Sequence, residues 1–387
     1  MKAFTLLGLA ATMMMAGCTA QGGSTAAGGR SAENMDPTTL KGALGQYFLI
    51  GTSVNDRQAF GLDARGDSLI ARHFNCVVAE NSMKHEVVHP REGVYDFDKG
   101  DALVKFAEDN GLKLTGHCLV WHSQCAPWLF VDDEGKTVDA ETLKERMREH
   151  ITTVLQHYKG KMVGWDVVNE AIMENGSYRR SKFYEILGEE FIPLAFQYAH
   201  EADPDVELYL NDYNMHHAGK RDAYVRIVKD LQARGLRIDA VGMQGHMGLD
   251  YPTIEDFEAT IEALAGAGVK VMVTEWDMSA LPTLHQSANV GDVFRPRRRR
   301  GEPLPPELNP YTEALPDSVS EAWNARMGEF MDLFIKHADV ITRVTAWGSH
   351  DAISWKNGFP IPGRTDYPLL FGRDYQAKPF LKKYGVK

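Results

Sequence analysis

The chain has 387 residues, of which 44% are hydrophobic and 25% are charged, and its formal net charge is −11. This composition is typical of a soluble globular protein and argues against a disordered or fibrous chain. Surfaces that bind nucleic acid or anionic membranes need an excess of Lys and Arg. The acidic balance therefore argues against those partners and favours a neutral or cationic one.

The N-terminus has the pattern of an export signal. Lys2 precedes an apolar run over residues 4–15, which is too short to span a bilayer, and small residues follow up to Cys18. The arrangement resembles a bacterial lipoprotein signal, in which residues 1–17 are removed and Cys18 is lipidated. We therefore expect an exported, outer-membrane lipoprotein that faces the periplasm or the cell surface. An ordinary signal peptide with an incidental cysteine is the alternative.

The segment 18–38 is predicted to be a flexible linker, because its stretch 22–29 has no apolar side chain large enough to form a core. From about residue 40, β-rich apolar runs alternate with amphipathic helical patterns, as in a parallel sheet with helical crossovers. The predicted strands are 47–55, 74–84, 113–122, 163–171, 207–214, 240–248, 269–278 and 344–354.

Two of the intervening helices have clear signals. One has apolar residues at helical spacing over 224–231, with Gly235 as a stop signal. The other continues to about residue 264 behind the start signal Thr253-x-x-Asp256.

Eight such units favour an α/β fold of the closed (β/α)8 TIM-barrel type, formed as a single domain by residues 39–387. No GxGxxG motif follows the first strand, which argues against a dinucleotide-binding sheet. The Pro-rich region 279–319, which contains the arginine-rich stretch 295–300, is predicted to be an extended loop on the active-site face after the seventh strand. It could contact acidic substrate decorations or be merely solvated.

Metal and disulfide chemistry is not expected. Three cysteines follow Cys18, namely Cys76, Cys118 and Cys125. An odd number without CxxC spacing excludes a disulfide framework, although one bridge stays open. No HExxH motif is present, and His117 and His122 are five positions apart on a predicted strand, so alternation would place them on opposite faces. We expect no metal and no organic cofactor.

Two glutamates stand where an apolar strand gives way to a loop: Glu170 after the fourth strand and Glu275 in the seventh. Glu is depleted in strands and rarely buried without a partner, so these positions indicate chemistry rather than two rim salt bridges, which are the alternative. Paired carboxylates suit glycoside hydrolysis, in which one group protonates the leaving oxygen and the other attacks the anomeric carbon. Retention of configuration requires about 5–5.5 Å between them.

Four segments resemble glycoside hydrolase family 10: 80–84, 116–124, 165–170 and 273–275. That family is dominated by endo-β-1,4-xylanases with a (β/α)8 fold and a retaining mechanism, and the resemblance runs from about Gly51 to Lys378. It implies that Glu170 is the acid/base and Glu275 the nucleophile. It also implies xylan and xylo-oligosaccharides as partners.

The resemblance further implies that His246 contacts the nucleophile and is supported by Asp277, and that Trp347 and Trp355 bracket the eighth strand as sugar platforms. Asn169 would bind the 2-hydroxyl of the sugar at the cleavage site. The full set of implied substrate-binding residues is Glu80, Asn81, Lys84, His117, Trp121, Gln124, Asn169, Gln244, His246, Trp347 and Trp355.

Departures from the family pattern are Trp276 in place of Leu, the segment 350–352, and the long loop 279–319. We expect them to affect the outer subsites. They resemble lipoprotein variants of Bacteroidetes.

Two other functions stay open: a β-1,4-glucanase or mixed xylan and glucan hydrolase on the same barrel, and a non-catalytic glycan-binding lipoprotein. The first differs in steric closure near the sugar C5, and the second would be expected to lack one catalytic Glu. We expect a monomer.

Overall fold

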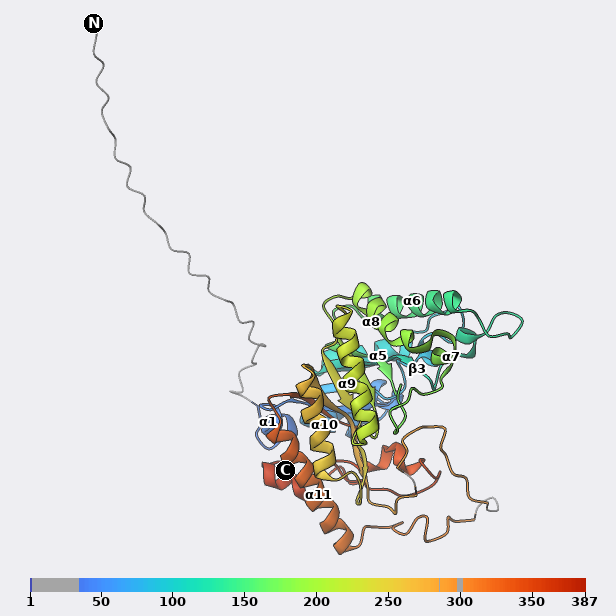
Figure 1. Ribbon diagram of the computed structural model, residues 1–387. Coiled ribbons are helices and arrows are strands. Elements are labelled where there is room, and N and C mark those ends of the chain that lie inside the picture. Colours follow the sequence, from blue (N-terminus) through green and yellow to red (C-terminus); the bar gives the residue numbers. More distant parts are fainter. Residues whose placement is uncertain (2–34, 285, 298–301) are drawn as a thin grey trace. The chain divides into compact units, whose positions relative to one another are not determined.

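Nine parallel strands occupy the eight positions of a closed barrel (Figure 1). The strands are β1 (Leu49–Val54), β2 (Cys76–Ala79), β3 (Lys113–Trp121), β4 (Gly164–Asn169), β5 (Glu207–Asp212), β6 (Ala240–Met243), β7 (His246–Gly248), β8 (Lys270–Ser279) and β9 (Ile341–Ala346). Sequential neighbours pair except for β6 and β7, β9 pairs with β1, and β8 pairs with both β6 and β7, which closes the barrel. The predicted (β/α)8 fold is confirmed.

This computed structural model describes Met1 and residues 35–284, 286–297 and 302–387. The predicted signal peptide, Cys18 and most of the linker lie outside the described residues, as do Arg298–Arg300. Residues 35–387 form one unit. Within the described ranges, no helix is both long and apolar enough to cross a membrane, and Cys76, Cys118 and Cys125 are free thiols.

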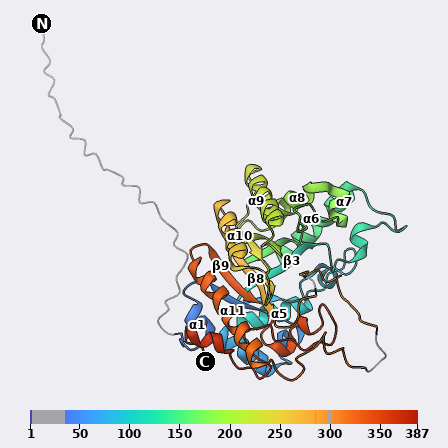
Figure 2. The same ribbon diagram turned by 60° about the horizontal axis from the view of Figure 1, so that its bottom comes forward.

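The helices lie outside the strands of this unit (Figures 1 and 2). They are α1 (Leu40–Leu44), α2 (Asp56–Ala59), α3 (Ala64–His73), α4 (His85–Val88), α5 (Asp98–Asp109), α6 (Ala140–His157), α7 (Lys182–Leu187), α8 (Phe191–Ala202), α9 (Ala218–Ala233), α10 (Ile254–Gly266) and α11 (Asp317–Lys336). Short 3-10 helices are η2 (Pro127–Phe130), η3 (Gly188–Glu190), η4 (Asp351–Ile353), η5 (Trp355–Asn357) and η6 (Pro379–Tyr384).

The two helices with clear sequence signals form as predicted. The side chain of Thr253 accepts a hydrogen bond from the Asp256 amide at 3.0 Å, which satisfies one of the free N–H groups at the start of α10. Tyr224, Ile227, Val228 and Leu231 of α9 are buried, and Gly235 adopts a positive φ of 71° just beyond the end of the helix.

The predicted sixth strand is interrupted. Gln244 and Gly245 separate β6 from β7, and Gly245 has a φ of 81°, a conformation that does not continue a strand. The interruption turns the Gln244 carbonyl toward β8, where it accepts a hydrogen bond from the Glu275 amide at 2.7 Å. The break therefore fixes the backbone beside Glu275.

The predicted bounds of the eighth strand, 344–354, are wrong. The strand is β9, Ile341–Ala346, because the backbone turns at Gly348 with a φ of 132° and continues into η4 and η5. Trp347 and Trp355 therefore both follow the strand instead of bracketing it.

Candidate active site

Glu170 and Glu275 line the same cavity, of about 210 Å³, at the carboxyl ends of the barrel strands. Their exposed fractions are only 4% and 5%. Glu170 follows β4 directly and has a φ of 57°, and its amide donates to the carbonyl of Asn211 at 2.8 Å. The parallel barrel thus brings together two carboxyls that are far apart in the sequence.

Uncharged donors hold the carboxyl of Glu170. Trp121 Nε1 donates to its Oε2 at 2.8 Å, and Gln244 Nε2 donates to its Oε1 at 3.0 Å. The Arg179 guanidinium binds the backbone carbonyl of Glu170 instead, at 2.9 Å. Uncharged N–H groups orient a carboxyl without favouring its ionised form as strongly as a cation would, which suits a group that must both give and take a proton.

A histidine separates Glu275 from a second buried carboxylate. His246 Nε2 lies 3.1 Å from Glu275 Oε2, and His246 Nδ1 lies 3.0 Å from Asp277 Oδ2. Trp355 Nε1 also donates to Asp277 Oδ2, at 2.7 Å. Burial alone would lower the pKa of His246, but the Asp277 and Glu275 carboxylates raise it to about 9. The imidazole is therefore protonated at neutral pH and can donate in both directions.

The same contacts favour an ionised Glu275. Burial alone would raise the pKa of Glu275, but the hydrogen bond from His246, nearby His117 and a further donor, Asn211, hold it below its ordinary value. Asn211 Nδ2 donates to Glu275 Oε1 at 2.8 Å. A buried carboxylate with this set of donors is ready to act as a nucleophile.

Side-chain amides connect the two carboxyls. Asn211 Nδ2 lies 3.0 Å from Asn169 Oδ1, and Gln244 Nε2 lies 3.2 Å from the same atom. Asn211 also accepts from the Thr274 hydroxyl at 2.6 Å. These contacts keep the carboxyls at a fixed spacing and leave little freedom to Asn169.

A polar wall is formed by the segments that follow β2 and β3. Lys84 Nζ donates to Asn81 Oδ1 and to Gln124 Oε1, both at 2.8 Å, and lies 4.8 Å from the centre of the Trp121 ring. Burial lowers the pKa of Lys84 and raises that of Glu80. On another side, the His117 and Trp347 rings meet edge to face, 5.4 Å apart. Such alternation of polar and aromatic groups suits the hydroxyls and C–H faces of sugars.

Every residue that the sequence predicted as substrate-binding lines this one cavity. Asp277 lies behind it, fully buried, in contact with His246.

The chain matches the family described as Glycosyl hydrolase family 10 over residues 39–384. The chain belongs to glycosyl hydrolase family 10. It is 48% identical over 347 residues to endo-1,4-beta-xylanase A of Xylanibacter ruminicola, covering 89% of this chain and 92% of the relative. It is 37% identical to a beta-1,4-xylanase of Dictyoglomus thermophilum, covering 90% of each. It is thus an enzyme of the glycoside hydrolase class.

Solved structures agree with this assignment. A GH10 endoxylanase retrieved from a sugarcane soil metagenome has a TM-score of 0.84 and 38% identity, covering 89% of this chain and 99% of that one. Xylanase XynB from Paenibacillus barcinonensis has a TM-score of 0.79 and 34% identity, covering 90% and 98%.

In this family 10 chain, the long loop after β8 reaches the active site, as its position predicted. Ala288 and Val290 line the cavity with the glutamates, and Asn214 Nδ2 donates to the carbonyl of Gln286. The loop therefore forms part of the cleft. The sequence alone had not decided whether the loop contacts the substrate or is merely solvated.

Trp276 and His350, from two of the departures from the family pattern, are not among the residues that line the cavity. Trp276 alternates with Glu275 along β8, so its ring faces outward, where it packs against Phe334 of α11 at 5.1 Å. His350 is also buried and lies 3.6 Å from Asp63.

Sequence reasoning missed Asn211, and it placed His122 wrongly. The pairing of β3 with β4 shifts register after His117, so alternation does not hold along the strand, and His122 Nδ1 lies 3.9 Å from Glu170 Oε2. His117 and His122 therefore both lie beside the active site.

Asn211 could have been identified from the sequence as a site residue by its place at the carboxyl end of β5.

A larger cavity of about 520 Å³ lies elsewhere, lined by residues of α7, α8 and α9 that include Tyr184 and Arg226, and by Tyr178 from the segment between β4 and α7. It contains neither of the two site glutamates. The smaller cavity is the active site because the paired carboxyls, the amides and the tryptophans converge there.

Proposed function

We propose that this enzyme is a retaining endo-β-1,4-xylanase, which cleaves internal β-1,4-xylosidic bonds of xylan through a glycosyl-enzyme intermediate. One observation carries the proposal: two buried glutamates share a cavity, and one is held by uncharged donors while the other is held by a protonated histidine. That asymmetry separates an acid from a nucleophile.

In the first step, a carboxylate oxygen of Glu275 forms a bond to the anomeric carbon while Glu170 gives its proton to the departing glycosidic oxygen. Glu170 is then ionised and Glu275 is an ester. In the second step, Glu170 takes a proton from water as the water oxygen attacks the anomeric carbon, and the bond to Glu275 breaks. Both residues return to their starting state.

Substrate contacts follow from the cavity lining. Asn169 binds the 2-hydroxyl at the cleavage site, where the contact strengthens as positive charge develops on the ring. Lys84, Asn81 and Gln124 bind hydroxyls of the preceding sugar, and Trp347 and Trp355 pack on C–H faces. The names of the relatives support xylan as the polymer.

The test is the product pattern from unsubstituted xylan and from β-glucan, with the configuration of the first-formed ends resolved by NMR. We expect short xylo-oligosaccharides with β ends and little action on glucan. Equal rates on glucan would indicate the mixed hydrolase, α ends would contradict retention, and xylan binding without cleavage would indicate the binding-protein alternative.

We also propose that the chain is exported and anchored to the outer membrane by lipid on Cys18, and that it acts as a monomer. The support for the anchor is the apolar run before Cys18 and the Gly-rich segment after it. In a bacterial host, Cys18→Ser is expected to abolish palmitate labelling and to release activity from the membrane fraction. Labelling that persists in this variant would exclude the anchor, and light scattering on the soluble domain tests the monomer.

A further inference from the structure

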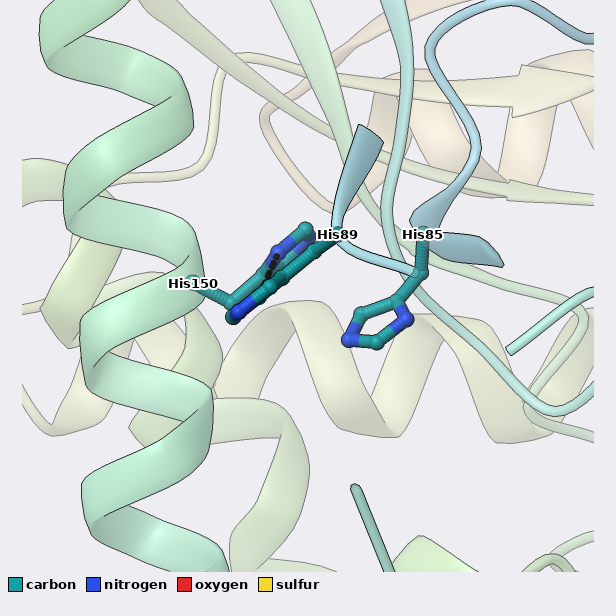
Figure 3. A group of neighbouring side chains, drawn as sticks. All are labelled: His85, His89 and His150. Carbon is teal, nitrogen blue, oxygen red and sulfur yellow. Dashed lines mark hydrogen bonds between the residues drawn. The ribbon is translucent and has the colours of Figure 1, made fainter. Parts of the chain in front are cut away.

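Three buried histidines meet outside the active-site cavity, but they do not form a ligand site (Figure 3). His85 Nδ1 accepts a hydrogen bond from the Ala126 amide at 3.2 Å, and His89 Nδ1 and His150 Nδ1 are hydrogen-bonded to each other at 3.3 Å. Burial lowers the pKa of all three imidazoles, so each ring is neutral and has one N–H group. Only one of these three rings then keeps a nitrogen lone pair free, which is too few for a metal ion.

The cavity of about 520 Å³ has the character of a binding pocket. It lies where α7, α8 and α9 come together on one side of the barrel (Figures 1 and 2). Buried apolar side chains form its inner surface, among them Ile172, Ile192, Ala223, Ile227 and Leu231. Ligand pockets of proteins are typically about 300–1,000 Å³ and combine such an apolar surface with a few polar groups.

Four polar groups that line this cavity make no hydrogen bond or ion pair with any part of the chain that the structure describes. They are the hydroxyls of Tyr178 and Tyr184, the guanidinium of Arg226 and the carboxylate of Glu189. Both tyrosines are partly exposed, and Arg226 and Glu189 are exposed. A ligand can therefore bind all four groups without breaking an existing interaction.

The chemistry of the lining suits an uncharged sugar chain. The rings of Tyr178 and Tyr184 stack with centres 5.2 Å apart and planes 16° from parallel. Aromatic rings pack on the C–H faces of sugars, and free hydroxyl and charged groups bind sugar hydroxyls. The charged residues of the lining are two acids and two arginines, so their charges balance and favour a neutral ligand over an ion.

A hairpin that follows Glu170 borders both this cavity and the active site. It is closed by the antiparallel pairing of Ile172 with Tyr178, and both of these residues line the cavity. Glu174 of the same hairpin accepts a hydrogen bond from Asn214 Nδ2 at 3.3 Å. Asn214 also donates to a carbonyl of the loop that lines the cleft. One short segment thus connects the two places, and a polymer is the kind of ligand that can reach both.

We propose that the cavity between α7, α8 and α9 is a second binding site for xylan, which holds a short run of unsubstituted xylose units outside the catalytic cleft. The inference rests on the proposed xylanase activity. The site binds the polymer and takes no part in cleavage. A second point of attachment raises the local concentration of substrate at the cleft, so the enzyme stays on the polymer between cleavages.

The first experiment follows hydrogen exchange of the full chain carrying Glu275→Gln, which cannot cleave, with and without xylohexaose. We expect slower exchange in two regions, the cleft segment 80–84 and the cavity helix 182–187. Adding Arg226→Glu is expected to remove the protection at 182–187 and keep it at 80–84. Lys229→Glu makes the same charge change at an exposed position of α9 that does not line the cavity, and it should keep both.

The second experiment separates attachment from turnover in the chain that retains Glu275. Arg226→Glu, Tyr184→Ala and Lys229→Glu should have the wild-type kcat/KM on xylotetraose, because none of these residues lines the cleft. Arg226→Glu and Tyr184→Ala should bind insoluble xylan about threefold or more weakly than the wild type, whereas Lys229→Glu should bind it equally.

Protection at 80–84 without protection at 182–187 would overturn the second site and leave the xylanase activity standing. Equal binding of insoluble xylan by Arg226→Glu and Lys229→Glu would overturn it as well. Absence of protection in both regions, with no turnover of xylotetraose by the wild type, would contradict the proposed xylanase activity together with the second site.

Discussion

At the nucleophile, a single imidazole lies between two buried carboxylates. Two negative charges this close would repel each other and favour protonation of one of them, which would remove the nucleophile. The protonated His246 prevents this by donating to both Glu275 and Asp277. The charge balance of this trio, more than any one residue, makes Glu275 reactive.

Replacing the nucleophile should remove turnover and keep binding. Glu275→Gln retains the shape of the side chain but cannot form the ester, so kcat on xylo-oligosaccharides is expected to fall by about 10⁴-fold or more. Calorimetry with xylotetraose should still detect binding. Glu255→Gln, at an exposed position of α10, is the control and should leave kcat unchanged. Near-normal kcat in Glu275→Gln would refute the nucleophile assignment.

Activity should depend on the protonation of His246 at alkaline pH. The pKa of His246 in the folded protein is about 9, above the value of about 6.5 in an unfolded chain. Its stabilising contribution is therefore fully present below pH 6.5 and is lost as the pH rises through 9. Both kcat/KM and the unfolding temperature are expected to fall over that range.

The variant His246→Gln separates this effect from general alkaline denaturation. The variant should have a lower kcat/KM at neutral pH and should lack the fall in kcat/KM that deprotonation of the imidazole causes at alkaline pH. If kcat/KM of the variant falls at alkaline pH as it does in the wild type, another group controls that fall.

At the scale of elements, α9 is tied to β5 by an ion pair inside the protein. Lys220 Nζ donates to Asp212 Oδ1 at 3.0 Å, and both side chains are fully buried. Tyr224 of the same helix donates to Asp212 Oδ2 at 2.6 Å. Because Asp212 adjoins Asn211, this pair holds the end of β5 where Asn211 meets the nucleophile.

Breaking the pair should destabilise the domain strongly. Lys220→Met leaves the Asp212 carboxylate buried without its cation, and such a change costs about 3–5 kcal/mol. Lys229→Met, at an exposed position of the same helix, should change stability little. Denaturant unfolding of both variants measures the difference, and equal stabilities would contradict the role of the buried pair.

At the scale of the whole molecule, residues 35–387 contain every group assigned to the reaction and form one unit. A fragment that begins at Ser31 should therefore fold and have the same kcat/KM on soluble xylo-oligosaccharides as the longer chain. A lower value for the fragment would mean that the preceding segment contributes to catalysis. Steady-state kinetics on matched preparations provides the comparison.

The loop between β8 and α11 was identified from its length and proline content, but its effect on the cleft was not. Proline restricts the backbone locally, so it indicates where regular structure stops. Whether Ala288 or Val290 reaches the cavity depends on the path of the whole loop, which no local pattern encodes.

The sequence by itself determined the alternating order of strands and helices and the placement of Glu170 directly after β4, because periodicity and strand boundaries are local properties. Glu275 was assigned to the right strand, but it lies inside β8, which continues to Ser279 beyond the predicted transition to a loop. Closure of the parallel barrel then puts the carboxyl ends of the strands on one face. Tertiary structure alone decided the break at Gly245, the bridging role of Asn211, and the meeting of His89 with His150, which are 61 positions apart. Contacts between distant segments depend on packing and register, and these are properties of the assembled barrel.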